Sequence, residues 1–260
     1  MGEALLRGIL DSGFLKLTDI IFYDSDDDRS GYIKNNYKIY SAKGIIEVVR
    51  NSRYILLAIK PQNIKDVLEQ IKDNFNCKNN LIISIVAGIP TGYIEKVLNS
   101  NVPVIRMMPN TPALFKKGMT AISKGRFAGD RDLLFPKNLI ENVGNYVIID
   151  EKYQNIATAL NGSGPAYFFL FCKYLIEAGI KNGLDPEVSK KLVVGTMIGS
   201  GITIEKSKFN VDKLIKMVAS RGGTTERALK EFYRGDLEKM VYSAVKSAKN
   251  KADELKDFID

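Results

Sequence analysis

The chain has 260 residues, a formal net charge of +8 and no histidine, so it can bury a sizeable core but cannot use Ser-His-Asp or Cys-His catalysis or most zinc sites. Its lysines are interleaved with Asp and Glu rather than gathered in a basic block, which predicts a solvated surface and no nucleic-acid binding. No apolar run approaches the roughly 20 residues of a membrane span, which predicts a cytoplasmic protein without membrane contact.

The first half of the chain alternates short apolar runs with amphipathic stretches. Its first residues predict an amphipathic helix that ends near Ser12 and Gly13. The apolar runs predict buried strands at residues 20–23, 54–59, 81–86, 102–106, 119–123 and 146–149. Helices are expected between them, at residues 43–50, 62–72 and 92–98. Strands that alternate with helices in this way indicate a parallel α/β sheet.

After Asp150 the pattern changes to long helical stretches without evident strands. The expected helices cover residues 165–182, 186–206, 211–219, 224–233 and 237–258. We therefore predict two domains, an α/β domain at residues 1–150 and an all-α domain at 151–260. Cys77 and Cys172 lie far apart in the sequence, which predicts two free thiols and no metal site.

One turn in the helical half has the features of an anion site. Gly222 and Gly223 allow a tight turn, and the residues after them open a helix whose unpaired amides favour negative charge. Ser220, Thr224 and Thr225 add uncharged hydroxyl donors. An ordinary Ser/Thr helix cap with a glycine turn explains the same residues equally well.

The segment at residues 218–225 resembles the C-terminal signature of the pyrroline-5-carboxylate reductase family, usually Val-x-Ser-Pro-Gly-Gly-Thr-Thr. Three further motifs of that family follow the same order along the chain. They are residues 57–62 (Leu-Ala-Ile-Lys-Pro-Gln), 106–113 (Arg-Met-Met-Pro-Asn-Thr-Pro-Ala) and 161–167 (Asn-Gly-Ser-Gly-Pro-Ala-Tyr). The resemblance covers essentially the whole chain, and it implies a Rossmann-like parallel-sheet domain followed by an all-α dimerisation domain.

The resemblance also implies an activity, namely the reduction of the cyclic imine pyrroline-5-carboxylate to L-proline by NADPH or NADH. Ser220 and the amides of Gly222, Gly223, Thr224 and Thr225 would then hold the substrate carboxylate. The Thr225 hydroxyl would act as the catalytic group, hydrogen-bonded to the ring nitrogen. The family's proline is Arg221 here, which adds charge near the carboxylate but loosens the turn. The helical half would pair two chains into a homodimer or a larger homo-oligomer.

The cofactor-binding residues follow from the resemblance and from the rule that dinucleotides bind at the carboxyl ends of the strands. They are Ala58, Ile59, Lys60 and Pro61 after one strand, Val86, Ala87 and Gly88 after the next, and Asn110 at the nicotinamide end. Each has an ordinary alternative, since Lys60 alone is typical of a solvated lysine and Asn110 of a capped turn.

Cofactor preference depends on the end of the strand at residues 20–23. Asp24 lies where an acid binds a ribose 2′-hydroxyl, which argues for NADH. Ser25 and Arg29 keep some character of a 2′-phosphate site, whereas the acids at 26–28 would repel a phosphate. An acidic surface turn explains the same residues equally well.

The chain departs from the family at its start. Met1 and Gly2 match only the last two positions of the family's Gly-x-Gly-Asn-Met-Gly fingerprint, so the first strand and two pyrophosphate-facing glycines have no counterpart. We expect that the true start lies upstream, and that without those residues a strand slot is exposed and the pyrophosphate site is weakened.

Two other functions fit the same sequence. One is another imine or hydroxyacid dehydrogenase of similar two-domain build, which the glycine-threonine turn disfavours. The other is a non-catalytic oligomer subunit that has lost cofactor binding. Substrate profiling separates the first of these from the leading hypothesis, and a cofactor titration separates the second.

Overall fold

The computed structural model describes residues 1–255. The chain forms two compact units. The first contains Met1–Pro165 together with the residues from Ser247 onward, and the second contains Ala166–Lys246.

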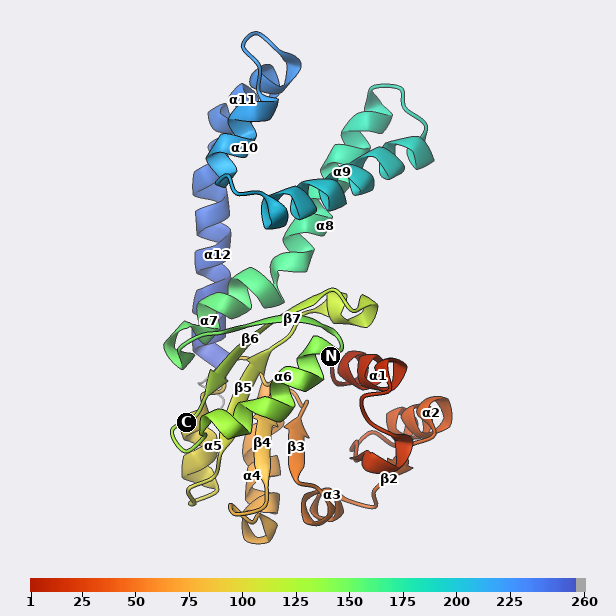
Figure 1. Cartoon of the computed structure of the whole chain (residues 1–260), viewed down its shortest axis with the longest axis vertical. Coiled ribbons are helices and arrows are strands. Elements are labelled where there is room, and N and C mark those ends of the chain that lie inside the picture. Colours follow the sequence, from red (N-terminus) through yellow and green to blue (C-terminus); the bar gives the residue numbers. More distant parts are fainter. Residues whose placement is uncertain (256–260) are drawn as a thin grey trace. The chain divides into compact units, whose positions relative to one another are not determined.

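The first unit alternates strands and helices. Its strands are β1 (Ile21–Phe22), β2 (Tyr40–Ser41), β3 (Tyr54–Leu57), β4 (Leu81–Ser84), β5 (Val104–Met108), β6 (Gly118–Lys124) and β7 (Gly144–Ile148). Its helices are α1 (Gly2–Ser12), α2 (Asp27–Tyr37), α3 (Ile45–Asn51), α4 (Ile64–Ile71), α5 (Thr91–Val97), α6 (Leu134–Glu141) and α7 (Gln154–Ala157) (Figure 1). The predicted strands and helices of this half are all present, with ends shifted by a few residues.

The strands form two sheets. Five of them are arranged in the order β3-β4-β5-β6-β7, and β1 pairs in parallel with β2 in a separate sheet. The neighbours β3, β4 and β5 are parallel, as the sequence predicts. Strand β6 is antiparallel to β5, so the prediction of a wholly parallel sheet is wrong at this pair. A connection of only nine residues, from 109 to 117, is too short for the helical crossover that a parallel pair requires.

Helices cover both faces of the five-stranded sheet. On one face Val49 of α3, Leu68 of α4 and Ile94 of α5 pack against buried residues of β3 and β4. On the other face Leu5 of α1 and Ile140 of α6 pack against β4, β5 and β6. The result is a three-layer arrangement of helices, sheet and helices, in which the strand ends are left open to carry a site.

Local signals set several helix ends. Helix α1 ends at Gly13, whose φ of 71° is the left-handed conformation that glycine adopts readily. Helix α2 begins where the Asp26 side chain accepts the Arg29 N–H at 3.0 Å. The sequence did not predict α2, because Ile33 is its only buried residue and it has no apolar stripe to recognise.

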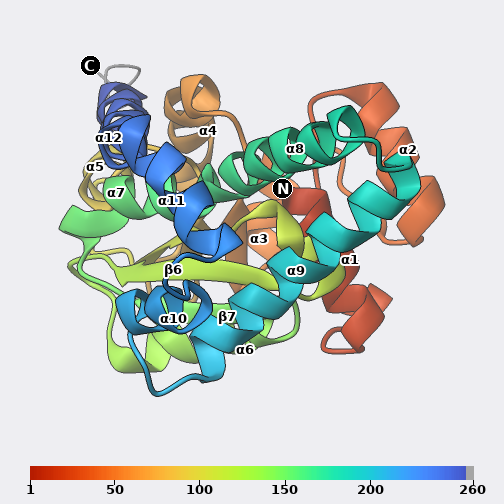
Figure 2. The ribbon, with the colours of Figure 1, turned by 90° about the horizontal axis from the view of Figure 1, so that it is seen from above.

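The second unit is helical throughout. Its helices are α9 (Pro186–Lys206), α10 (Val211–Val218), α11 (Thr224–Arg234), most of α8 (Gly164–Lys181) and the first part of α12 (Leu237–Glu254). All five predicted helices are present; residues 256–258 of the last prediction lie outside the described residues. Helices α8 and α9 form a hairpin in which the Ser189 hydroxyl donates to the Ile176 carbonyl at 2.9 Å (Figure 2).

Candidate functional site

The predicted cofactor residues of the first unit lie at one edge of the sheet. Ala58–Pro61 follow β3, Val86–Gly88 follow β4, and Asn110 follows β5. Since these strands are adjacent and parallel, their carboxyl ends share an edge. The Ile85 N–H donates to the Leu57 carbonyl at 3.1 Å, which fixes the register of the first two loops. The structure therefore brings these three groups of residues together.

Two glycines allow close packing of helices at this edge. A methyl group added to Gly2, at the start of α1, would lie 2.9 Å from the Ala58 Cβ, so the helix begins directly beside the loop after β3. Gly88 has a φ of +77°, and a side chain there would meet the Ala252 carbonyl at 2.9 Å. The unpaired amides of the first turn of α1 thus lie next to the loop after β3, and a helix N-terminus favours negative charge.

Asp24 and Ser25 follow β1, and their neighbourhood is already well bonded. The half-buried Asp24 accepts the Asp26 N–H through Oδ1 at 3.1 Å, whereas Ser25 is exposed. Arg29 is hydrogen-bonded and ion-paired to Glu3 of α1, and the Tyr37 hydroxyl donates to the same carboxylate at 2.7 Å.

Glu3 and Tyr37 shift each other's pKa values. The hydrogen bond from Tyr37, helped by Arg29 and opposed by burial, lowers the pKa of Glu3. Burial and then the Glu3 carboxylate raise the pKa of Tyr37 to about 12. The guanidinium that sequence reasoning assigned to a phosphate site is therefore committed to a carboxylate, an interaction that could be found only from the fold.

Asn110 is a buried link between two segments. Its Nδ2 donates to the Asn161 Oδ1 at 2.9 Å, and its Oδ1 accepts the Met119 N–H at 3.0 Å. Asn161 in turn donates to the Met108 carbonyl at 2.6 Å. Both ends of the Asn110 amide are thus engaged in holding the loop after β5, which favours the turn-forming explanation of this residue and leaves its contact with a nicotinamide as a prediction.

A buried polar network lies beside this edge and was not predicted. Arg106 of β5, only 3% exposed, pairs with Glu151 at 3.5 Å and donates to the Asn155 Oδ1 at 2.7 Å. Thr91 binds the same carboxylate through its N–H at 2.7 Å and its hydroxyl at 2.6 Å. Burial lowers the pKa of Arg106, opposed by the Glu151 charge. Arg106 is the first residue of the motif at 106–113, but its partner Glu151 lies 45 residues away in the sequence, and no local pattern reveals such a pair.

The predicted substrate residues form a turn between α10 and α11 in the second unit. Gly222 has a φ of +76°, so its left-handed conformation requires glycine. A side chain on Gly223 would lie 2.6 Å from the Ser220 Oγ, which explains the second glycine. The Gly223 N–H donates to the Ser220 carbonyl at 3.0 Å, and helix α11 starts at Thr224. The structure brings Ser220, Thr224 and Thr225 to one exposed or half-buried turn.

Glu226 completes this turn and was not among the predicted site residues. It is the third residue of α11, and its Oε2 accepts the Gly222 N–H at 2.6 Å. That hydrogen bond, and then Lys230, lower the pKa of Glu226. A Glu at the third helical position is the usual partner of a helix N-terminus, so the spacing was a usable signal.

Other chemistry is not evident in residues 1–255. They contain no group of three or more His, Cys, Asp or Glu able to hold a metal ion. No helix among them is long and apolar enough to cross a membrane. Cys77 is an exposed free thiol and Cys172 a half-buried one.

Comparison with known proteins identifies the class and then the family. Residues 1–88 match the family model described as NADP oxidoreductase, coenzyme F420-dependent, and residues 151–255 match the model for pyrroline-5-carboxylate reductase dimerisation. With the Rossmann-like unit, these matches define an oxidoreductase of the nicotinamide-cofactor class.

Full-length similarity defines the family. A pyrroline-5-carboxylate reductase of Mycobacterium tuberculosis is 33% identical, over 98% of this chain and 94% of its own length. Pyrroline-5-carboxylate reductase 2 of Bacillus subtilis is 31% identical over 99% and 92%. The Plasmodium falciparum pyrroline carboxylate reductase, solved with NADP bound, superposes with a TM-score of 0.89 at 32% identity, covering 98% of this chain and 94% of that one. The chain belongs to the pyrroline-5-carboxylate reductase family.

Proposed function

We propose that this chain reduces pyrroline-5-carboxylate to L-proline with NADPH or NADH. The observation that carries the proposal is the turn at residues 220–226, where two glycines and the start of α11 expose amides and hydroxyls together in a member of this family. The substrate is a small anion, so a nucleic acid is not expected at the site.

The second unit would bind and orient the substrate. The first amides of α11, at Thr224 and Thr225, have no carbonyl partner within the helix, and the helix dipole favours a carboxylate beside them. Ser220 contributes a neutral hydroxyl, and Arg221 adds an exposed positive charge. Holding the carboxylate in this way leaves the Thr225 hydroxyl to hydrogen-bond the ring nitrogen and fix its position.

The first unit fits a dinucleotide at the carboxyl edge of its sheet. The close approach of Gly2 to Ala58 places the first turn of α1 beside the loop after β3. Met1 and Gly2 would present the first amides of α1 to a phosphate, Asp24 and Ser25 would meet the ribose, and Ala58–Pro61 and Val86–Gly88 would line the cleft, with Asn110 at the far end. A nicotinamide cofactor bound here supplies the hydride. Because a protonated imine is already electrophilic, positioning by these residues suffices without a histidine acid.

The domain roles and the assembly complete the proposal. We assign cofactor binding to residues 1–150, and substrate binding and dimerisation to residues 151–260, in a cytoplasmic homodimer or larger homo-oligomer. The match of residues 151–255 to a dimerisation model supports this assignment.

The test is an assay of the purified protein with pyrroline-5-carboxylate and either NADPH or NADH. We expect substrate-dependent oxidation of at least one cofactor, with proline as the product. A folded protein that oxidises neither cofactor with this substrate contradicts the proposal. Turnover of other cyclic imines or hydroxyacids alone would support a related dehydrogenase, and a failed cofactor titration would support a non-catalytic subunit.

A further inference from the structure

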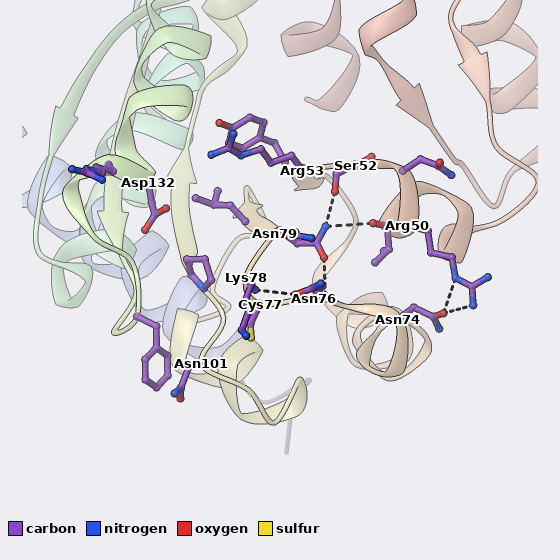
Figure 3. A pocket seen from close by; sticks show the side chains of 18 residues that line it. Arg50, Ser52, Arg53, Asn74, Asn76, Cys77, Lys78, Asn79, Asn101 and Asp132 are labelled. Carbon is purple, nitrogen blue, oxygen red and sulfur yellow. Dashed lines mark hydrogen bonds between the residues drawn. The ribbon is translucent and has the colours of Figure 1, made fainter.

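A cavity opens at the other edge of the five-stranded sheet. It has a volume of about 910 Å³ and is lined by the segments that lead into β3, β4 and β5 together with the segment from Phe127 to Asp132 (Figure 3). Arg53 and Tyr54 stand at the start of β3, and Asn80 and Leu81 at the start of β4. The proposed cofactor residues follow the opposite ends of these strands, so the cavity is separate from that site.

The lining of this cavity carries excess positive charge. Among the described residues that line it, the cations are Arg50, Arg53, Lys78 and Arg131, and the one carboxylate is Asp132. That carboxylate is engaged, because its Oδ2 accepts the Gly129 N–H at 2.8 Å. None of the four cations forms an ion pair with any residue of the described part of the chain.

The fold itself accounts for one of these cations. Arg50 lies in the last turn of α3, where a cation stabilises the helix end, and it donates to the Asn74 Oδ1 at 3.0 Å from Nε and at 2.6 Å from Nη2. The other three cations lack such a role. Arg53 and Lys78 lie outside helices, and Arg131 lies in a single 3-10 turn.

The carbonyl groups of Val49 and Ser52 at this edge are hydrogen-bonded to Asn80 and not to the cations. The Asn80 Nδ2 donates to the Ser52 carbonyl at 2.6 Å and to the Val49 carbonyl at 3.4 Å. The Asn80 Oδ1 accepts the Asn76 N–H at 2.7 Å, which fixes the loop before β4. The cavity wall is thus held in place by asparagines. Lys78 and Arg131 have no side-chain hydrogen bond or ion pair in the described residues, and Arg53 lies over the Tyr54 ring, 5.3 Å from its centroid.

We propose that this cavity binds a small molecule with clustered phosphate groups. Guanidinium groups and a lysine ammonium are the side chains that bind phosphate most strongly, in bidentate fashion and as a point charge respectively. The volume lies within the range of roughly 300–1,000 Å³ that is typical of small-molecule sites. Such a ligand would act on the enzyme from outside the reaction centre, so the inference goes beyond the proposed reaction.

The probe is inorganic tripolyphosphate, titrated by calorimetry against the full chain at constant ionic strength. The variants Lys78→Glu and Arg131→Glu change exposed side chains without a hydrogen bond or an ion pair in the described residues, so folding should be kept. The matched control is Lys34→Glu, an equal charge reversal at an exposed position of α2. We expect each cavity variant to bind the probe at least tenfold more weakly and the control to bind like wild type.

Hydrogen exchange locates the site independently. Tripolyphosphate should protect amides at residues 76–80 and 127–132, whether or not it also protects the proposed cofactor loop at 58–61. Equal binding by all variants, protection confined to 58–61, or tighter binding of an oligoglutamate peptide than of tripolyphosphate would each overturn the proposal. These readouts require no turnover, so their failure is distinguishable from failure of the proposed reductase activity.

Discussion

The two compact units differ in the burial of their apolar side chains. In the first unit, large residues such as Ile82, Ile105 and Leu68 are fully buried between sheet and helices. In the second unit no hydrophobic residue between 166 and 246 is buried, and Phe168 and Phe169 of α8 are 62% and 64% exposed. The first unit closes its own core, whereas the second presents an apolar surface of the kind that a partner covers. A single chain thus contains one unit that buries its own core and one whose large apolar side chains are exposed.

The largest predicted effect is on stability, and it concerns the ion pair of Arg106 with Glu151 in the first unit. Arg106→Ala leaves Glu151 without its cation, which should lower the free energy of unfolding by about 3 to 5 kcal/mol. Urea denaturation at several protein concentrations measures this, and the loss should not depend on concentration. The control Arg126→Ala removes an exposed cation from the same unit and should cost less than about 1 kcal/mol. Equal stability of the two variants would contradict the structural role of Arg106.

The second effect should be on assembly. Phe169→Asp places a charge on the exposed apolar surface of α8 and should weaken self-association at least a hundredfold, or about 3 kcal/mol. Light scattering coupled to size-exclusion chromatography reports the change in mass. Phe115→Asp, at a 79% exposed phenylalanine of the first unit, is the control and should leave the mass unchanged. An unaltered oligomer in the Phe169 variant would mean that α8 is not part of the interface.

The third effect tests the turn in the second unit. Thr225→Ala should lower kcat and kcat/KM together by about 5- to 150-fold, because the lost hydrogen bond strengthens as charge shifts on the ring nitrogen. Ser220→Ala should mainly raise KM, since its bond to the carboxylate is similar in ground and transition states. Thr225→Ser, which keeps the hydroxyl, should recover most of the activity. Wild-type kinetics in a folded Thr225→Ala protein would show that the hydroxyl only caps α11.

The smallest effect concerns cofactor choice in the first unit. Asp24→Ser should raise the NADPH to NADH ratio of kcat/KM about fivefold, by removing repulsion of a 2′-phosphate. The gain is modest because Arg29 remains paired with Glu3. Steady-state kinetics with both cofactors measures the ratio, and an unchanged value would show that Asp24 does not meet the ribose.

The same contrast explains how far the sequence could predict the molecule. Strands β3, β4 and β5 were predicted because a closed core imposes apolar runs. Helices α9 and α10 were predicted from their helical patterns, and the structure adds that Asp185 and Asn210 cap them. The turn at Gly222 and Gly223 was found because a positive φ demands glycine. The features that the sequence did not predict are of two kinds. Helix α2 has only a weak apolar pattern, and the ion pairs of Arg106 with Glu151 and of Glu3 with Arg29 join residues far apart in the sequence. The direction of β6 depended on the length of the connection before it, not on its composition.

The hydrogen bond between Gly222 and Glu226 gives the proposed substrate turn an anion of its own. The Glu226 carboxylate accepts the Gly222 N–H at 2.6 Å and holds the turn in shape. A substrate carboxylate that uses this amide must displace a competitor tethered four residues away, whose effective concentration is set by the chain itself. The affinity for the substrate then reflects how much more favourably its carboxylate binds the Gly222 N–H than the Glu226 carboxylate does. The turn is therefore held in a fixed shape before binding, but its affinity for a carboxylate is lower. A lower affinity favours the release of proline after each turnover.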